Sequence, residues 1–415
     1  MSPFTLAKIC HTWRELAFST PSLWCNISVN AYEPNLLLLN HRVAHSGVMP
    51  LSIHLFWLPN PRPEGPSRQA ISSVIEQLHR TSSLCLNLPI KSITRLSTVL
   101  SSPNAAPLLE DLHLHSHIFV TIPLKGAIEP PHKRRLLLEY LDCDEIRLDW
   151  MNISHLTLKR CRIAGVLSNI LASKDLKHFA LEYCEVPRGQ TIVDCRSIEV
   201  LSLKSFHSAE FMLTKTSLRS LRNLEIDVGD AVDQLYPLIP DFLHRSLCQL
   251  QVLIIHDWGK YASEEADDRL VPALIGALKS ANALQHLTLE AYENFPSSNP
   301  EPFVQHLLLE RDFLPCLQTL SLRARYILPI DLMLNVLAAD GDSSETTTPV
   351  RPLRKFNLEL WMTLLEIGPL LRDDVLRILQ LRAACKTISI RCALRWDLPE
   401  LTTDVILYWK RKYGL

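Results

Sequence analysis

Three histidines at alternate positions are the first residues whose type and spacing could support chemistry. His113, His115 and His117 would lie on one face of an extended strand. Imidazole is a common zinc ligand, but three such positions on one strand span too far for one tetrahedral ion. No carboxylate or cysteine completes an obvious set, so we expect neither a zinc site nor any other cofactor.

Other catalytic patterns are weak. Asp142-Cys143-Asp144 resembles the Asp-x-Asp string of nucleotide-sugar enzymes only as a string. The chain has 11 glycines but no phosphate-binding loop, dinucleotide fingerprint, nucleophile elbow or His-Glu-x-x-His. Its 11 cysteines form no Cys-x-x-Cys pair, which favours buried free thiols over disulfides or a zinc knuckle. We therefore expect that the protein is not an enzyme.

The composition indicates a folded chain without a strong electric field. Of 415 residues, 47% are hydrophobic and 21% are charged, and the formal net charge is -1. A balanced charge gives no long-range attraction to nucleic acid or anionic lipid. No run approaches 18 apolar residues, and the N-terminus shows no charged leader before an apolar core. We expect no nucleic-acid or membrane partner and a cytoplasmic and/or nuclear location.

A repeated strand signature must position any functional residues. Ile153-Ser-His-Leu156-Thr-Leu158-Lys-Arg-Cys161 is followed 23 residues later by Leu176-Lys-His-Phe179-Ala-Leu181-Glu-Tyr-Cys184. Each copy predicts a short strand, a turn under which the small Cys packs, and a return segment. Further copies begin at residues 109, 198, 221, 250, 284, 317, 353 and, weakly, 385, with a degenerate strand expected near Ile146-x-Leu148. No unit can bury its apolar face alone, so the units must stack.

The predicted fold class is α/β: a leucine-rich-repeat-like solenoid with a curved parallel sheet and helices on the convex side. Spacings of 22 to 23 residues before residue 221 predict tight return segments. Spacings of 29 to 36 beyond it leave room for helices, expected at 270–281, 302–311, 330–338 and 369–381.

Three regions are predicted. Residues 1–30 form a helical segment, 31–100 an entry segment, and 101–415 the solenoid with a helical cap at 401–412. The entry segment predicts helices at 33–46, 70–78 and 93–100, strands at 51–57 and 84–88, and an exposed Pro-rich loop at 59–66. Residues 340–349 read as a disordered loop. The basic end of the cap is expected to complement the helix dipole rather than bind nucleic acid.

The N-terminal segment carries a specific string, Pro3-x-x-Leu6-Ala-x-Ile9-Cys10-x-x-Trp13-Arg14-x-Leu16-Ala17-x-Ser19-Thr20-Pro21-x-Leu23-Trp24. Its apolar residues recur at intervals of three and four positions: Leu6, Ile9, Cys10, Trp13 and Leu16. This spacing predicts one apolar stripe on one amphipathic helix that ends at Pro21. The string resembles the second half of an F-box, in the form common in mushroom-forming fungi. The resemblance continues into 46–53 and 83–89, which in that family join the F-box to its repeats.

The resemblance implies a substrate receptor of an SCF-type cullin-RING ubiquitin ligase, which grips a Skp-type adaptor and selects a protein substrate. It implies these adaptor-binding residues: Leu6, Ile9, Cys10, Trp13, Leu16, Pro21, Leu23 and Trp24. The usual Leu-Pro-x-Glu opening and first helix are missing, which leaves three alternatives. The first is that the chain still binds the adaptor. The second is that it is a scaffold that recruits no ligase, and the third is that Trp13 and Trp24 merely pack the helix against the repeats.

The concave face of the solenoid offers a column of mixed charge that suits a protein or peptide with its own charge pattern. We expect substrate-binding residues at Lys159, Glu182, Lys204, Asp227, His256, Glu290 and Arg323. Three aromatic side chains could form binding hot spots at its rim: Trp258, Tyr292 and Trp361. The alternatives are that the charged residues are simply solvated and that the aromatic residues fill the wider repeats.

Overall fold

In the computed structural model the chain forms two compact units, residues 1–190 and 191–415. It describes residues 3–57, 68–100, 102, 104–116, 135–145, 150–187, 192–227, 232–256, 264–290, 300–310, 312–324, 330–338, 352–363, 372–383, 387–393 and 402–413. Each unit is an α/β structure in which parallel strands alternate with helices or turns, as the sequence predicts.

The first unit begins with three short helical segments, α1 (Pro3–Ala7), α2 (His11–Phe18) and the 3-10 turn η1 (Pro21–Trp24). Strands and helices then alternate: β1 (Asn26–Asn30), α3 (Leu36–His45), β2 (Leu51–Phe56), α4 (Arg68–Gln77), η2 (Leu78–Arg80), β3 (Thr81–Asn87), α5 (Ile90–Leu100), β4 (Asp111–His115), β5 (Arg135–Glu139), η3 (Cys143–Glu145), β6 (His155–Lys159), α6 (Leu167–Leu171) and β7 (His178–Glu182). The strands pair in parallel in chain order.

The second unit repeats this plan with longer helices. Its elements are β8 (Val193–Cys195), β9 (Val200–Lys204), α7 (Phe206–Lys215), β10 (Thr216–Leu218), β11 (Asn223–Asp227), α8 (Val232–Leu235), α9 (Leu238–Ser246), β12 (Val252–His256), α10 (Glu264–Leu278), β13 (His286–Glu290), α11 (Glu301–Leu309), β14 (Thr319–Ala324), α12 (Ile330–Ala338), β15 (Lys355–Thr363), α14 (Arg372–Ala383), β16 (Thr387–Ala393), β17 (Thr402–Asp404) and α15 (Val405–Tyr413). Strands β9 and β11 to β16 are parallel neighbours; β17 closes the order antiparallel, and β8 pairs with β10 separately.

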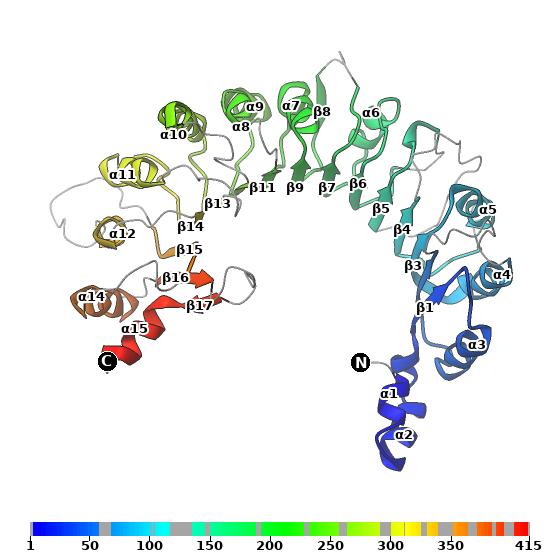
Figure 1. Ribbon diagram of the computed structural model, residues 1–415. Helices are drawn as coiled ribbons and strands as arrows, with labels where there is room; N and C mark the ends of the chain where they lie inside the picture. Colours follow the sequence, from blue (N-terminus) through cyan, green and yellow to red (C-terminus); the bar gives the residue numbers. More distant parts are fainter. Residues whose placement is uncertain are drawn as a thin grey trace. The chain divides into compact units, whose positions relative to one another are not determined.

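Alternating burial explains why these stretches form strands. In β4 and β6, for example, the second and fourth residues are buried, and the first, third and fifth are only partly buried. The buried residues are the leucines of the repeat signature, such as Leu156 and Leu158, and in each unit the helices lie on one side of the strands (Figure 1). The odd-numbered strand positions form the other face, which we call the open face, with His113 and His115 of β4 as examples.

The cysteine turn of the short repeats is confirmed. Cys161 and Cys184 are buried, and their thiols lie 3.3 Å from the Leu138 carbonyl oxygen and 3.2 Å from that of Leu158. One residue before each cysteine the backbone is left-handed, with φ of 49° at Arg160 and 55° at Tyr183. A small side chain that can donate to a carbonyl of the preceding strand therefore fits this turn. Nine cysteines among the described residues carry free thiols, as predicted, but only four of them are buried, three are partly buried and two are exposed.

Strand β5 was not predicted. It pairs with β4 and β6 and buries Leu136 and Leu138 in the usual pattern. The repeat signature begins with an apolar residue three positions before the first of these leucines, but Lys133 stands there. The degenerate strand expected near Ile146 lies outside the described residues, as do the loops at 59–66 and 340–349.

The predicted helices have counterparts within a few residues, from α3 in the entry segment to α10, α11, α12 and α14 in the wide repeats. Two predictions were wrong in detail. The N-terminal stripe does not lie on one helix, because Cys10 is extended, with φ -158° and ψ 178°, and separates α1 from α2. The cap begins at Val405 rather than at residue 401, because β17 precedes it.

Candidate functional site

Large apolar side chains are exposed on the N-terminal segment. Ile9, Trp13 and Leu16 have exposed fractions of 57%, 44% and 53%. Trp13 and Leu16 lie three residues apart on α2, so they share one face of the helix. The 44% exposure of Trp13 argues against a role that is purely packing. Cys10 and Pro21 are also exposed, and Leu6 and Leu23 are partly buried.

Trp24 does not belong to this exposed set. It is fully buried, and its indole Nε1 donates to the Ala17 carbonyl oxygen at 2.7 Å. Its ring stacks on Phe18 with centroids 5.4 Å apart, and it meets Phe4 edge-on at 5.0 Å. The other side of the ring contacts His41 and His45 of α3. Trp24 therefore anchors the helical segment to the first strand-helix repeat, and its predicted place in a partner interface is not supported.

The charged column on the open face of the second unit forms a continuous ladder. His256 of β12 lies between two carboxylates: its Nε2 is 3.0 Å from Glu225 Oε1, and its Nδ1 is 2.8 Å from Glu290 Oε2. Arg323 continues the ladder, since its guanidinium lies 3.6 Å from Glu290 Oε2 and 3.0 Å from Glu359 Oε1. His256, Glu290 and Arg323 were predicted as neighbours, and the parallel register confirms this.

The ladder alters the charge states of its members. Hydrogen bonds to Glu225 and Glu290 raise the pKa of His256 to about 10, although burial opposes the shift. The same hydrogen bonds lower the pKa of Glu225 and of Glu290. Because carboxylates only accept hydrogen bonds, both ring nitrogens of His256 must donate, and the ring is an imidazolium cation. The ladder thus presents alternating charges with fixed positions.

Beside the ladder, a hollow of about 480 Å³ opens between β13 and β16. Its floor consists of small polar side chains: Thr288, Ser321, Asn357 and Ser389. Asn357 Nδ2 donates to Ser321 Oγ at 2.9 Å, which fixes part of this floor. Glu290, Arg323 and Glu359 line one side, and Lys355 and Thr387 also line the hollow. This lining offers hydrogen bonds and charges, which suit an extended polar ligand. It differs from the closed, mainly apolar pocket that is typical of small-molecule sites.

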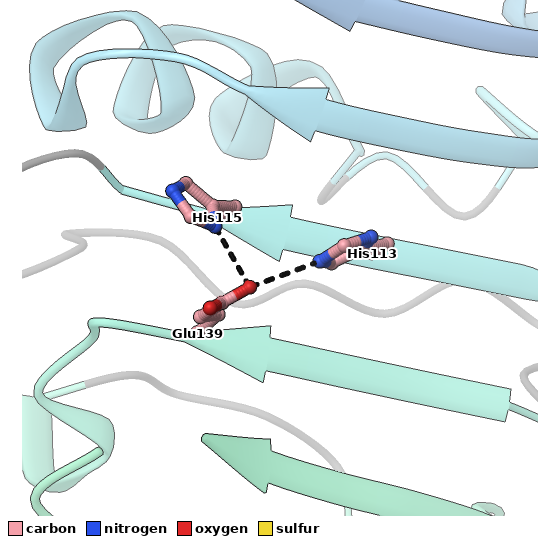
Figure 2. A group of neighbouring side chains, drawn as sticks. All are labelled: His113, His115 and Glu139. Carbon is pink, nitrogen blue, oxygen red and sulfur yellow. Dashed lines mark hydrogen bonds and ion pairs between the residues drawn. The ribbon is translucent and has the colours of Figure 1, made fainter. Parts of the chain in front are cut away.

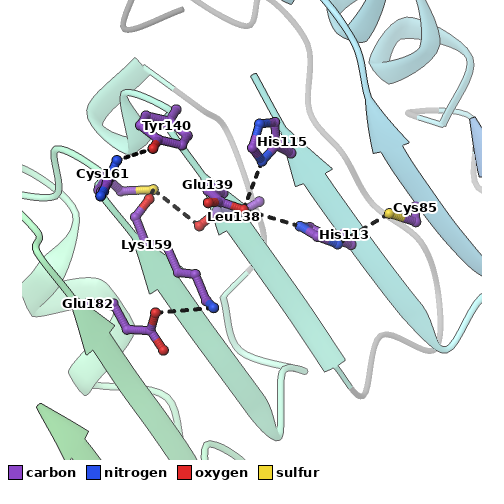
Figure 3. Close-up of polar contacts among 10 residues, drawn as sticks. Cys85, His113, His115, Leu138, Glu139, Tyr140, Lys159, Cys161 and Glu182 are labelled. Atoms are coloured by element: carbon purple, nitrogen blue, oxygen red, sulfur yellow. Dashed lines mark hydrogen bonds and ion pairs between the residues drawn. The ribbon is translucent and has the colours of Figure 1, made fainter. Parts of the chain in front are cut away.

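The open face of the first unit carries a second group of polar contacts (Figure 3). Lys159 of β6 forms an ion pair with Glu182 of β7 at 3.1 Å, so these two predicted residues are neighbours. In register beside Lys159 on β5 lies Glu139, which the sequence analysis missed together with its strand. The sequence does contain a signal for this strand. Leu136-x-Leu138 is followed five residues later by Cys143, as Leu156-x-Leu158 in the next repeat is followed five residues later by Ile163.

Glu139 joins two of the alternating histidines (Figure 2). Its Oε2 lies 2.8 Å from Nδ1 of His115 and 3.8 Å from Nε2 of His113. Cys85 of β3 lies on the other side of His113, with Sγ 3.2 Å from Nδ1. Burial lowers the pKa of His113 and raises that of Cys85 to about 11, which favours a neutral ring beside a neutral thiol. The expectation that no carboxylate or cysteine lies near these histidines is therefore wrong, because Glu139 and Cys85 do. His117 lies outside the described residues.

The remaining predicted substrate-binding residues are only partly placed. Lys204 ends β9, and Asp227 ends β11 in register with His256, so both lie on the open face. Trp258 and Tyr292 lie outside the described residues. Trp361 belongs to β15, but the position of its side chain is not described. The predicted aromatic rim is therefore untested.

Within the described part of the chain, no helix combines the length and the apolar character needed to cross a bilayer. No protein-family model matches the sequence. No curated protein matches it with significance either.

Proposed function

We propose that the protein is a non-catalytic protein-binding subunit that serves as the substrate receptor of an SCF-type cullin-RING ubiquitin ligase. One observation carries the proposal: Ile9, Trp13 and Leu16 expose apolar surface in the segment whose string resembles the second half of an F-box. Exposed apolar side chains that gather on one short segment mark a protein-binding surface more often than chance exposure. The partner we propose is a Skp-type adaptor, and the ligase would act in the cytoplasm and/or nucleus.

The anchoring of the segment supports this role. The aromatic contacts of Trp24 with α1, α2 and α3 hold the helices against the first repeat, while Trp13 and Leu16 of α2 stay exposed. A fixed docking segment loses little conformational entropy on binding. Because Trp24 is buried, only the exposed part of the F-box-like string, with Ile9, Trp13 and Leu16, is available to an adaptor. Trp24 contributes by holding that part in place.

The open face would select the substrate. A leucine-rich-repeat-like solenoid presents an extended face, and the ladder beside the hydroxyl-lined hollow suits a polar segment of chain with charges of both signs. The mechanism is proximity, because a substrate held beside the ubiquitin carrier meets it at a raised effective concentration. No chemical step is assigned to this chain.

The test is co-expression of the full chain with a Skp-type adaptor, followed by co-purification. Trp13→Asp should reduce capture at least tenfold, since a buried interface Trp commonly contributes about 2 kcal/mol or more. Leu16→Asp should also reduce capture, because it would bury a charge in the same apolar surface. Leu37→Asp is the matched control, because Leu37 of α3 is 85% exposed but lies outside the F-box-like string. Capture that survives both α2 substitutions would refute the proposed interface.

The alternative is a repeat scaffold that binds proteins through the open face without recruiting a ligase. Its expected result is that neither the wild-type chain nor the control captures the adaptor. The same experiment therefore separates the two functions.

A further inference from the structure

We propose that His113, His115 and Glu139 form a binding site for one divalent transition-metal ion, of which Zn²⁺ is the best match. The three side chains come from adjacent strands, β4 and β5, and lie on the open face (Figure 2). One ligand atom from each can be chosen so that all three lie within 4.8 Å of one another. The site is independent of the proposed ligase function and could exist in a scaffold equally well.

The register of the strands creates this arrangement. Glu139 lies directly opposite His115, and His113 lies two residues earlier on the same face of β4. Cross-strand neighbours stand about 5 Å apart, so a carboxylate between two imidazoles reaches both. Sequence spacing alone cannot show this, because 24 residues separate His115 from Glu139.

Two of the three distances between ligand atoms are close to those of a tetrahedral site. Metal-nitrogen and metal-oxygen bonds of about 2.1 Å at tetrahedral angles place ligand atoms about 3.4 Å apart. The two distances from Glu139 Oε2, 2.8 Å to His115 Nδ1 and 3.8 Å to His113 Nε2, lie on either side of that value. Shifts of about half an ångström would bring these two contacts to the tetrahedral value, and the two histidine ligand atoms lie within 4.8 Å of each other.

One nitrogen has a buried position without a hydrogen bond. His113 Nε2 is shielded from solvent and finds no hydrogen-bond partner among the described residues, since 3.8 Å to Glu139 is too long. A buried polar atom in this state is unfavourable unless something satisfies it. An ion between His113 Nε2, His115 Nδ1 and Glu139 would satisfy this atom and replace the His115 hydrogen bond.

Cys85 supports the correct tautomer of His113. Its Sγ lies 3.2 Å from Nδ1, so a proton on Nδ1 would be donated to sulfur, and the Nε2 lone pair would face Glu139 (Figure 3). Most metal-bound histidines are oriented by an outer hydrogen-bond partner, and the Cys85 sulfur would take that place here. Lys159, which lies opposite Glu139, forms its ion pair with Glu182 instead. Glu139 therefore remains directed at the histidines.

The ligand set selects the class of metal. Two imidazoles and one carboxylate suit Zn²⁺ and its neighbours, whereas Mg²⁺ and Ca²⁺ require mainly oxygen ligands. Three protein ligands leave a fourth position for water. The site is thus an open three-ligand site on the face that we propose for partner binding.

The test is titration of the metal-free full chain with ZnCl₂ by isothermal titration calorimetry, and with CoCl₂ by visible absorption. The wild type should bind one equivalent at this site, and bound Co²⁺ should give the absorption of a tetrahedral ion. Each of His113→Gln, His115→Gln and Glu139→Gln should weaken binding by about 100-fold or more. Cys85→Ala should weaken it by about tenfold, as loss of an outer partner does.

A matched control addresses nonspecific binding to surface histidines. His155 and His178 form another cross-strand pair, with ring centroids 4.0 Å apart. The double variant His155→Gln, His178→Gln should retain the wild-type Zn²⁺ affinity. Circular dichroism should show each variant folded; Glu139→Gln, which preserves size and shape, remains informative if a histidine variant unfolds. The proposal is overturned if the wild type does not bind, if the ligand variants bind as tightly as the wild type, or if the control abolishes binding.

Discussion

Replacement of His256 by Gln should destabilise the protein in a manner that depends on pH. In the wild type, both ring nitrogens donate to carboxylates, Nε2 to Glu225 and Nδ1 to Glu290. Gln cannot carry the positive charge that both carboxylates require. Arg323 would continue to compensate Glu290, so the main loss falls on Glu225.

The magnitude follows from the pKa, which these hydrogen bonds raise from 6.5 to about 10. At 1.36 kcal/mol per pH unit, the whole shift corresponds to an upper limit of about 5 kcal/mol. The ring is 23% exposed, so solvent screens part of this interaction. Two charge-assisted hydrogen bonds, reduced by this screening, lead us to expect a loss of about 2 kcal/mol in the free energy of unfolding.

The sign of the pH dependence is fixed because the pKa is raised in the folded state. The stabilisation by His256 is fully present below pH 6.5, where the unfolded ring is also protonated, and is lost as the pH rises toward 10. Urea unfolding of wild type and His256→Gln at pH 6, 7.5 and 9 should therefore show a difference that shrinks at each step. His207→Gln, at a highly exposed histidine on α7, is the control. A difference that is constant or grows between pH 6 and 9 would refute the reasoning, as would an NMR titration that places the His256 pKa near 6.5.

Three further results are expected. Trp24→Ala should lower the free energy of unfolding of the first unit by about 3 to 5 kcal/mol, because it empties a closed aromatic cluster; a loss below 1 kcal/mol in denaturant unfolding would contradict the packing. Iodoacetamide at pH 8 should alkylate exposed Cys10 well before Cys184, whose pKa burial raises to about 12, as peptide mass spectrometry can show; equal rates would contradict the turn. Arg323→Glu should place three carboxylates together and lower the melting temperature by several degrees. The control is Arg377→Glu on α14, which breaks an exposed ion pair and should shift the melting temperature little. Equal shifts would argue against a ladder.

The repeat signature predicted the architecture because its leucines report on burial directly. A residue that is buried at every second position of a strand must be apolar in each repeat, and the printed sequence shows this from residue 109 onward. The same period identified the open-face positions, so the neighbours His256, Glu290 and Arg323 followed from spacing alone. Strand β5 was not predicted because Lys133 interrupts the signature. Without that strand, Glu139 could not be recognised as an open-face residue.

Side-chain environment was harder to predict than side-chain position. The string at the N-terminus contains two tryptophans of similar appearance, yet Trp24 is buried and Trp13 is exposed. The difference arises from α3, whose His41 and His45 complete the cluster around Trp24 and which no local pattern connects with it. The histidine site has the same origin, since β3, β4 and β5 each contribute to it. Contacts between repeats of variable length cannot be read from spacing within one repeat.

The most direct test of the proposed receptor function is assembly of this chain with the ligase components from purified parts. The full chain, a Skp-type adaptor and the adaptor-binding domain of a cullin would be mixed and analysed by sedimentation velocity. We predict one ternary species that contains all three proteins and that Trp13→Asp, but not Leu37→Asp, abolishes. An adaptor-cullin complex that sediments without the wild-type chain would contradict the account.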